Sequence, residues 1–541
     1  MTDKLIVTHG GALRRKYGAA GFRRIRAALG RLIAADRRRG LVAKVVLLDD
    51  PKAMRARRGA RLVDPGDHRT AKASIDAAFR AESPDYLLIV GAPDVVPHQP
   101  LANPLYDPPD EPDRYAWSDL PYACEAGYDT DIAAFVGPTR VVGRLPDLRG
   151  ATTPAEASYL VRLIDTAAGY RGRPADDYGE PFALSAKSWR ISSGRNCFAM
   201  FGRRDALRTS PPSGPRFADA ALARLTHFIN CHGNEGVPEF AGQYRKNYPV
   251  ALTTRSIAGR ISPGTVAGVE CCYGAQVYAA GLIGVDIPIG QSYLEQGAYG
   301  YFGSTTIAYG ESRGLSSADL VVQYFLLEVL GGASLGRAVL NARQRFVREL
   351  VDLDPTDLKT LAQFTLLGDP SIHPVDANAD PDAGPDRAGR DRPRRRPKAS
   401  AGRDAGERRL RRRERRVKLA AEGVFLQLTR ATASSAVAKP IVDRRIVREL
   451  AAIARGAGLS RGRRFREFAL RPPTVPDRPA TPGAKRARPK RSGTAARSVA
   501  DRRYFVAIEK PRGAGPGPRA TAVVVKTVGG RVVEVRTREQ R

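Results

Sequence analysis

Short apolar runs alternate with longer amphipathic stretches along most of the chain. Leu5–Thr8, Val42–Leu48 and Tyr86–Val90 are mostly apolar and have the length of strands. Between them, Arg14–Arg39 and Ala71–Ala81 carry apolar residues three or four positions apart, which predicts helices that face a core. Strands that alternate with helices predict a mainly parallel sheet with helices on its faces, so the expected fold class is α/β.

The same alternation returns after a polar joint at residues 171–180 that contains Gly, Pro and Asp. We therefore expect two α/β/α subdomains with mainly parallel sheets, one at residues 1–170 and one at residues 180–376. In the second subdomain the pattern predicts a strand at Trp189–Ser192 and helices at Phe217–Leu225, Ser316–Leu330 and Leu335–Leu350.

The remaining chain has a different composition. Residues 377–418 contain mainly Asp, Ala, Pro, Gly and Arg, which predicts a disordered basic linker. Residues 419–541 are expected to form a small, partly disordered module, in which Tyr504–Ile508 and Ala522–Val535 contribute strands and a hairpin turn lies at Gly529-Gly530.

The positive charge is concentrated in this last part of the 541-residue chain. Residues 381–541 hold 44 Lys and Arg against 15 Asp and Glu, a net charge of +29 out of the total of +33. Such a region can contact nucleic acid or another anionic surface, or it can be a solvated tail.

The five cysteines are too few for a disulfide framework in a chain of this length. The first residues lead directly into a strand without a charged and then apolar leader, so we expect no secretory signal, and no apolar run is long enough to span a membrane. We expect a cytoplasmic protein.

Two stretches carry the candidate chemistry. Residues 226–233 read as a buried strand that ends in His232-Gly233, and residues 266–274 read as one that ends in Cys271-Cys272-Tyr273-Gly274. The carboxyl ends of parallel strands meet at one edge of a sheet, so His232 and Cys272 should lie together there. A thiol beside an imidazole is the arrangement of a nucleophile with its base, and the N–H of Gly233 is a candidate donor to an oxyanion.

Cys271 and Cys272 point to opposite faces of their strand, so only one of them can face His232. Cys272 is nearer the turn and is the preferred nucleophile, whereas Cys271 reads as a buried core residue. A zinc site is disfavoured, because the sequence has no Cys-x-x-Cys and adjacent residues of a strand cannot converge on one ion. No metal or cofactor is expected.

The motifs resemble those of clan CD cysteine peptidases, which include caspases, legumains, clostripain, separase and gingipains. Ile229–Gly236 resembles the caspase-type His-Gly-x-Glu-Gly stretch, and Val269–Gly274 resembles Gln-Ala-Cys-x-Gly with Cys272 as nucleophile. Leu366–Ile372 is similar to the closing Leu-Gly-Asp-Pro segment of gingipain-type peptidases. The resemblance covers roughly residues 1–376.

This resemblance implies a caspase–haemoglobinase fold, a dyad of His232 and Cys272, and an oxyanion site at Gly233. It also implies cleavage of protein or peptide substrates after a selected side chain. Residues 304–311 follow a strand beyond the nucleophile, so Tyr309 is a candidate wall of the pocket for that side chain. The sequence does not indicate which side chain is selected.

A second hypothesis belongs to another class of protein. The chain could be a catalytically silent caspase-like scaffold whose basic C-terminal region binds nucleic acid or another anionic partner. Thiol reactivity at Cys272 distinguishes the two hypotheses.

Overall fold

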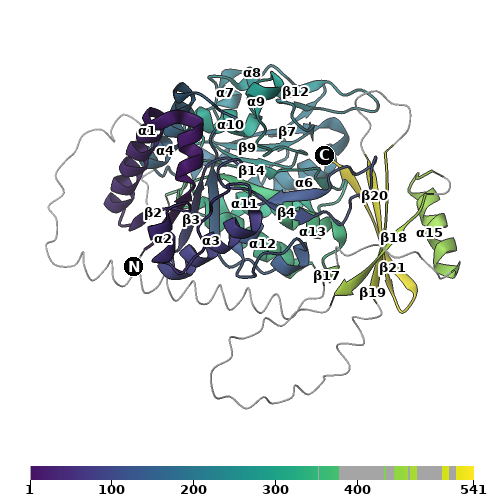
Figure 1. Cartoon of the computed structure of the whole chain (residues 1–541). Coiled ribbons are helices and arrows are strands. Elements are labelled where there is room, and N and C mark those ends of the chain that lie inside the picture. The colour runs from purple at the N-terminus through teal and green to yellow at the C-terminus, as the bar shows by residue number, and fades with distance from the viewer. Residues whose placement is uncertain are drawn as a thin grey trace, which may run out of the picture.

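The computed structural model describes residues 2–350 and 352–376, and, in the C-terminal region, residues 432–433, 444–460, 463–471, 502–510 and 520–541 (Figure 1). The predicted linker at residues 377–418 lies outside the described residues. The described chain has a mixed α/β fold with a large, mainly parallel central sheet, as the sequence predicts.

The central sheet has ten strands in the order β2-β1-β3-β6-β16-β14-β13-β9-β7-β8. These strands are short and almost entirely buried, except for the edge strands β2 and β8. Their bounds are β1 Lys4–Thr8, β2 Ala43–Leu47, β3 Tyr86–Val90, β6 Val141–Leu145, β7 Pro181–Ala186, β8 Leu207–Ser210, β9 Thr226–Asn230, β13 Val266–Val269, β14 Gly300–Ser304 and β16 Phe364–Gly368.

One strand joins the two halves of the chain into a single sheet. β16 comes from the end of the second half, yet it lies between β6 of the first half and β14 of the second. It runs parallel to β6 and antiparallel to β14, with Leu367 opposite both Arg144 and Tyr301. The sheets expected for the two subdomains are therefore continuous.

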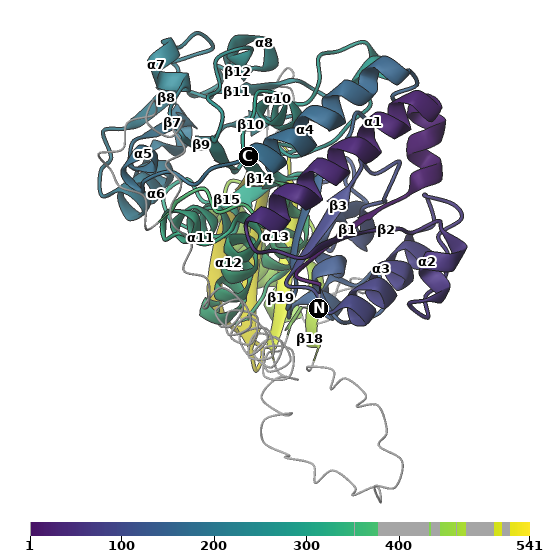
Figure 2. The same cartoon turned by 90° about the vertical axis from the view of Figure 1, so that its left-hand side faces the viewer.

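Helices cover both faces of the sheet (Figure 2). On β14, Tyr301 contacts Tyr293 of α10, and its neighbour Phe302 contacts Phe325 of α11. Adjacent residues of a strand point to opposite faces, so α10 and α11 lie on opposite sides of the sheet. The helices are α1 Gly10–Arg38, α2 Pro51–Arg55, α3 His68–Glu82, α4 Ala157–Gly169, α5 Asp176–Gly179, α6 Arg190–Phe201, α7 Asp219–Leu222, α8 Thr254–Ile257, α9 Ala280–Ile283, α10 Ile289–Glu295, α11 Ala318–Leu330, α12 Leu335–Glu349, α13 Pro355–Gln363 and α15 Arg444–Gly456, with 3₁₀ turns at Leu120–Ala123, Ile132–Phe135, Pro154–Glu156 and Lys187–Trp189.

The predicted strand at Trp189–Ser192 is wrong. The strand is β7, which ends at Ala186, and the chain then turns through Lys187–Trp189 into helix α6. Trp189 and Ser192 are buried, whereas Arg190 and Ile191 between them are exposed, which is the spacing of a helix and not the alternation of a strand.

The described residues up to 376 form the first unit of the molecule. The described C-terminal residues form a second sheet that docks on this first unit. Its order is β15-β21-β20-β19-β18-β17, where β15 is Tyr309–Gly310 of the second half. The other strands are β17 Thr432–Ala433, β18 Arg466–Arg471, β19 Arg502–Glu509, β20 Thr521–Val528 and β21 Arg531–Gln540, with the predicted turn at Gly529 and Gly530. This module is therefore tied to the first unit through the pairing of β15 with β21.

Two smaller sheets complete the fold. β4 Gln99–Ala102 pairs with β5 Tyr115–Ser118. Beyond the end of β9, β10 His232–Gly233 pairs with β11 Glu239–Ala241, which pairs with β12 Val250–Thr253. Of the described helices, none combines the length and apolar character that crossing a membrane requires.

Candidate active site

Neighbouring parallel strands bring the candidate dyad to one edge of the central sheet. β9 and β13 pair in register from Thr226 opposite Val266 to Ile229 opposite Val269, and the N–H of Glu270 continues the ladder with a bond to the Ile229 carbonyl of 2.8 Å. The chain then delivers His232 after β9 and Cys272 after β13. This is the common edge that the sequence predicts, at the carboxyl ends of the parallel strands.

His232 is held by contacts on several sides. Its Nε2 lies 2.9 Å from Oε1 of Gln243, and its ring packs against Trp189 at a centroid distance of 4.3 Å and against Tyr248 at 5.3 Å. An amide oxygen can only accept a hydrogen bond, so Nε2 carries the proton. In the neutral imidazole, Nδ1 is then the nitrogen that can take a proton from a thiol.

The arrangement around Gln243 follows from the small β10–β11 sheet. His232 pairs with Ala241 in this sheet, and Gln243 follows two residues later. The Nε2 of Gln243 donates to the Tyr248 hydroxyl over 3.0 Å, which directs its Oε1 toward the imidazole. A short hairpin therefore orients the candidate base.

Cys272 is fully buried in the described structure and contacts the backbone of the strand-to-turn segment after β14. Its Sγ accepts the N–H of Ala308 over 3.2 Å, and its own N–H donates to the carbonyl oxygen of Arg541 over 3.3 Å. The second contact identifies the N–H of Cys272 as a donor to a carbonyl at this site, in addition to the Gly233 donor that the sequence predicts.

Cys271 occupies a different environment. Its Sγ accepts the N–H of Cys231 over 3.2 Å inside the core. Burial raises the pKa of the Cys271 thiol well above its usual value, and burial also raises the pKa of Cys231. Both thiols therefore stay protonated, which agrees with the assignment of Cys271 as a core residue.

Gly233 lies directly against the candidate nucleophile. A Cβ atom on Gly233 would stand 1.7 Å from the carbonyl oxygen of Cys272, so only glycine fits here. Tyr273, the residue after Cys272, adopts a left-handed backbone with φ of 53°, which is costly for a residue with a side chain. Close backbone approach and a strained turn thus occur together at Cys272.

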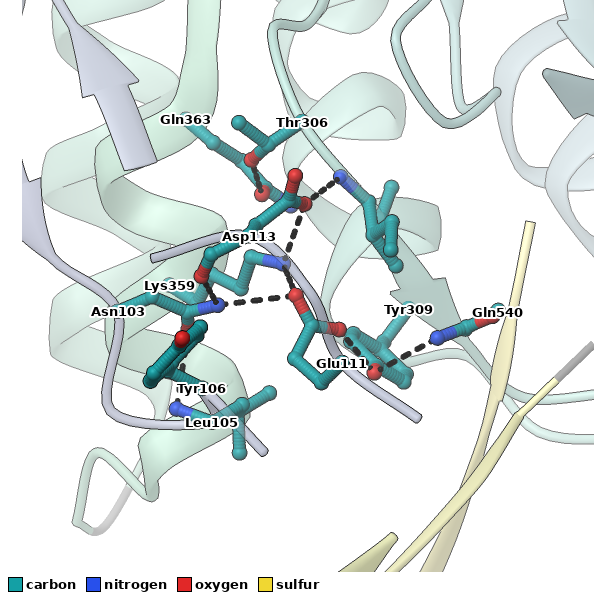
Figure 3. A network of polar contacts seen from close by, with 12 residues as sticks. Asn103, Leu105, Tyr106, Glu111, Asp113, Thr306, Tyr309, Lys359, Gln363 and Gln540 are labelled. Atoms are coloured by element: carbon teal, nitrogen blue, oxygen red, sulfur yellow. Dashed lines mark hydrogen bonds and ion pairs between the residues drawn. The ribbon is translucent and has the colours of Figure 1, made fainter. Parts of the chain in front are cut away.

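A buried polar network supports the turn from the side of the first half (Figure 3). Nζ of Lys359 contacts Glu111 at 2.6 Å and Asp113 at 3.3 Å, and Asp113 accepts the Tyr273 hydroxyl at 2.7 Å and the N–H of Ile307 at 2.8 Å. Burial raises the pKa of Glu111 to about 7, which Lys359 opposes. These contacts fix the segment between β14 and β15.

Tyr309, the predicted pocket wall, lies in this segment. It is buried, its hydroxyl donates to Glu111 over 2.5 Å, and it also bonds to the side chain of Gln540 at 3.2 Å (Figure 3). It therefore directly follows Ala308, which contacts Cys272, and it contacts the end of β21.

An acidic pocket lies next to Tyr309 and was not predicted from the sequence. Asp319, near the start of α11, and Glu270, which precedes the two cysteines, are both buried and share a hydrogen bond. Trp189 and Gly310 border the same pocket through their contacts with Arg541. Asp319 resembles an ordinary acidic residue in the first turn of a helix, so the sequence carried no signal for it.

The remaining histidines of the described chain have structural contacts. His9 caps α1 by accepting the N–H of Ala12 at its Nδ1. His227 lies between the Tyr293 hydroxyl and the Arg224 carbonyl, and burial lowers its pKa to about 3. Within the described ranges, no group of three or more His, Cys, Asp or Glu residues is arranged to hold a metal ion.

Comparisons with known proteins yield fold similarities alone. No protein-family model matches the sequence, and no curated protein matches it significantly. Among solved structures, the chain is similar to the Arg-specific cysteine proteinase gingipain R, with 11% identity, a TM-score of 0.47, and coverage of 69% of this chain and 78% of that one. It is also similar to a structure described as a protease, with 14% identity, a TM-score of 0.45, and coverage of 99% of this chain and 97% of that one.

Proposed function

We propose that the protein is a cysteine endopeptidase that hydrolyses peptide bonds through Cys272 and His232. The observation that carries this proposal is the delivery of a thiol and an imidazole to one sheet edge by the paired strands β9 and β13, beside a backbone N–H that binds a carbonyl oxygen. The bond between Gln243 and Nε2 supports the role of Nδ1 as proton acceptor.

In the proposed reaction, Nδ1 of His232 takes the proton of the Cys272 thiol, and the thiolate attacks the carbonyl carbon of the substrate. The N–H groups of Cys272 and Gly233 stabilise the oxyanion. The C–N bond then breaks as the imidazolium gives its proton to the leaving amine, which leaves a thioester. Water, deprotonated by His232, hydrolyses the thioester to a carboxylate and restores the thiol.

The alternative of a silent scaffold with a basic binding region gains no support from the described contacts. Several cations of the C-terminal sheet pair with carboxylates of the first unit, for example Arg463 with Asp110 at 2.7 Å and Lys526 with Asp352 at 2.6 Å. These cations are already neutralised within the chain. Nucleic-acid binding and a cytoplasmic location stay predictions from the sequence.

The test is cleavage of a mixed peptide library, followed by mass spectrometry, with the intact protein and with Cys272→Ala. We expect the substitution to lower cleavage by roughly 10⁴-fold, because the covalent step then has no nucleophile. Cys271→Ala is the matched control, since it removes a thiol of the same strand end and should retain cleavage. Peptide hydrolysis that continues unchanged in Cys272→Ala contradicts the proposal.

A further inference from the structure

The end of strand β21 lies across the candidate active site. Gln540 pairs with Tyr309 and Glu539 pairs with Gly310 in antiparallel register. The ladder continues with the N–H of Arg541, which donates to the Ala308 carbonyl over 3.0 Å, while the Arg541 carbonyl accepts the N–H of Cys272. An extended strand that adds to a sheet edge and places a carbonyl at the nucleophile is the geometry of a bound peptide substrate.

The side chain of Arg541 fills the acidic pocket. It is fully buried, and its Nη2 bonds to Oδ1 of Asp319 and to the carbonyl oxygen of Glu311, both at 2.8 Å. Its guanidinium also lies over the ring of Trp189, 4.3 Å from the centroid, where a cation is attracted by the aromatic face.

The shape of the pocket matches the guanidinium closely. A Cβ atom on Gly310 would lie 2.3 Å from Nη2, 2.5 Å from Nε and 2.7 Å from Cζ of Arg541. The absence of a side chain at Gly310 therefore leaves the space that the guanidinium occupies.

The charge of the pocket also suits one guanidinium. Burial raises the pKa of Glu270 well above its usual range, and the neighbouring Asp319 adds to this shift. Burial also raises the pKa of Asp319, but the guanidinium of Arg541 opposes this shift, and so do the N–H groups of Glu311 and Ser316, which donate to the Asp319 carboxylate. Glu270 thus keeps its proton, and one carboxylate faces one cation. Nδ2 of Asn196 holds Glu270 in place at 2.8 Å.

The three residues before Arg541 also make specific side-chain contacts. The indole N–H of Trp189 donates to the Glu539 carboxylate over 2.8 Å, and Nε2 of Gln540 donates to the Asp110 carbonyl over 3.2 Å. Arg538 pairs with the carboxylate of Glu311. Each of the four residues 538–541 therefore contacts the first unit with its side chain.

We propose that the pocket formed by Asp319, Trp189 and Gly310 selects an arginine side chain on the acyl side of the cleaved bond, and that residues 538–541 of the chain itself occupy this cleft and compete with added substrate. This inference rests on the proposed peptidase function. It adds the substrate class and an intramolecular competitor, both of which follow from contacts of this chain.

The first experiment compares fluorogenic peptide amides that end in arginine with identical amides that end in citrulline. Citrulline keeps the shape of arginine but has no positive charge. In the full-length Arg541→Gln variant, we expect kcat/KM to be at least about 100-fold higher for arginine, because citrulline leaves the buried Asp319 carboxylate without a cation. Equal rates for the two amides would overturn the assignment of the pocket.

The second experiment tests the competitor. We expect Arg541→Gln to raise kcat/KM for the arginine amide by about tenfold over the unchanged chain, because a tethered segment acts at an effective concentration near the millimolar range. Arg503→Gln is the matched control, since Arg503 lies in the same C-terminal sheet and pairs with Glu467 away from the cleft. The free peptide Arg-Glu-Gln-Arg should inhibit Arg541→Gln competitively. An unchanged kcat/KM in Arg541→Gln would overturn the proposal that residues 538–541 compete with substrate.

Iodoacetamide labelling of Cys272 separates the two proposals. We expect slow labelling in the unchanged chain, fast labelling in Arg541→Gln, and slow labelling again when His232→Ala is added. Suppose that Cys272 is labelled fast in both the unchanged chain and Arg541→Gln, and that arginine and citrulline amides are cleaved at equal rates. This result rejects the inference about the pocket and the competitor and is still compatible with the peptidase function. Slow labelling of Cys272 in Arg541→Gln, without cleavage of any peptide, rejects the peptidase function itself.

Discussion

At the scale of single residues, the side chain of Gln243 decides which nitrogen of His232 is available. The contact of 2.9 Å between Oε1 and Nε2 keeps the proton on Nε2. The hydroxyl of Tyr248, in turn, accepts from Gln243 and holds its amide in the orientation that presents oxygen to the imidazole. Second-layer contacts of this kind set the tautomer of a catalytic histidine.

Gly310 offers a direct test of the arginine pocket. We expect Gly310→Ala to lower kcat/KM for arginine amides by roughly 10- to 100-fold, because the added methyl group overlaps the space of the guanidinium and overpacking at this level costs about 1–3 kcal/mol. Steady-state kinetics on the arginine amide measure the effect. Gly30→Ala, at a site where a Cβ meets no atom within 4 Å, is the control and should leave the rate unchanged. An unchanged rate in Gly310→Ala would place the arginine elsewhere.

His232, Gly233 and Cys272 could be predicted from the sequence because each follows an apolar run that marks a buried strand. Trp189 and Asp319 could not. Trp189 lies in a short segment that the sequence reads as a strand, and Asp319 occupies an ordinary helix start. They are brought together by Arg541, whose contact with Cys272 spans about half of the chain and depends on how the two sheets pack together.

At the scale of elements, strand β9 and the residues that follow it carry two buried imidazoles with different contacts. His232 lies in β10, beyond the carboxyl end of β9, and contacts Gln243, whereas His227 is the second residue of β9 and lies between Tyr293 and Arg224. His227 stays neutral, because burial lowers the pKa of its imidazole to about 3.

This shift makes His227 a source of acid sensitivity. The unfolded chain binds a proton at His227 below about pH 6.5, whereas the folded chain resists it down to about pH 3, so the stability from neutral His227 is present above pH 6.5 and is lost as the pH falls. Over the interval from pH 6.5 to 5 the loss is about 2 kcal/mol.

Urea unfolding of the intact protein and of His227→Gln at pH 7 and pH 5 measures this effect. Glutamine can hydrogen-bond but does not titrate, so the stability difference between the two proteins should shrink by about 2 kcal/mol at pH 5. A difference that is the same at both pH values would show that His227 is not the titrating group.

The sequence also predicts the long helices α1, α3, α11 and α12, because amphipathic spacing is a strong signal over three or more turns. α11 and α12 begin within two residues of, or at, their predicted starts. α13 was missed because it has only nine residues and five of them are polar, although all nine are buried. The edge strand β8 was missed because Leu207–Ser210 contains little apolar surface.

At the scale of the whole molecule, opposite charges join the C-terminal sheet to the first unit. Asp352, which is buried, pairs with Arg502 at 3.1 Å and with Lys526 at 2.6 Å. Asp354, at the start of α13, lies 3.3 Å from Arg536 of β21. A second hydrophobic cluster, formed by Ile446 and Leu450 of α15 with residues of β19 and β20, stabilises the sheet itself.

We expect Asp352→Asn to loosen this docking. The substitution leaves Arg502 and Lys526 without their shared carboxylate, and the loss should be about 2 kcal/mol after discounting for the partial exposure of Arg502. Amide hydrogen exchange across residues 521–528 should become faster as a result. Asp165→Asn, which removes an exposed pair with Arg31, is the control and should leave that exchange unchanged. Equal protection in both variants would show that charge does not hold the sheet in place.

The position of β16 also sets the order in which the molecule can be completed during synthesis. The first strands of the chain, β1, β2, β3 and β6, can pair with one another early, but the open side of β6 has no neighbour until residues 364–368 have been made. A nascent chain that stops before this point exposes a strand edge in the middle of the future sheet, which is a template for intermolecular pairing. Folding of the first half is thus coupled to translation of the second. Polypeptides truncated before residue 364 should therefore aggregate and not form a soluble half-molecule.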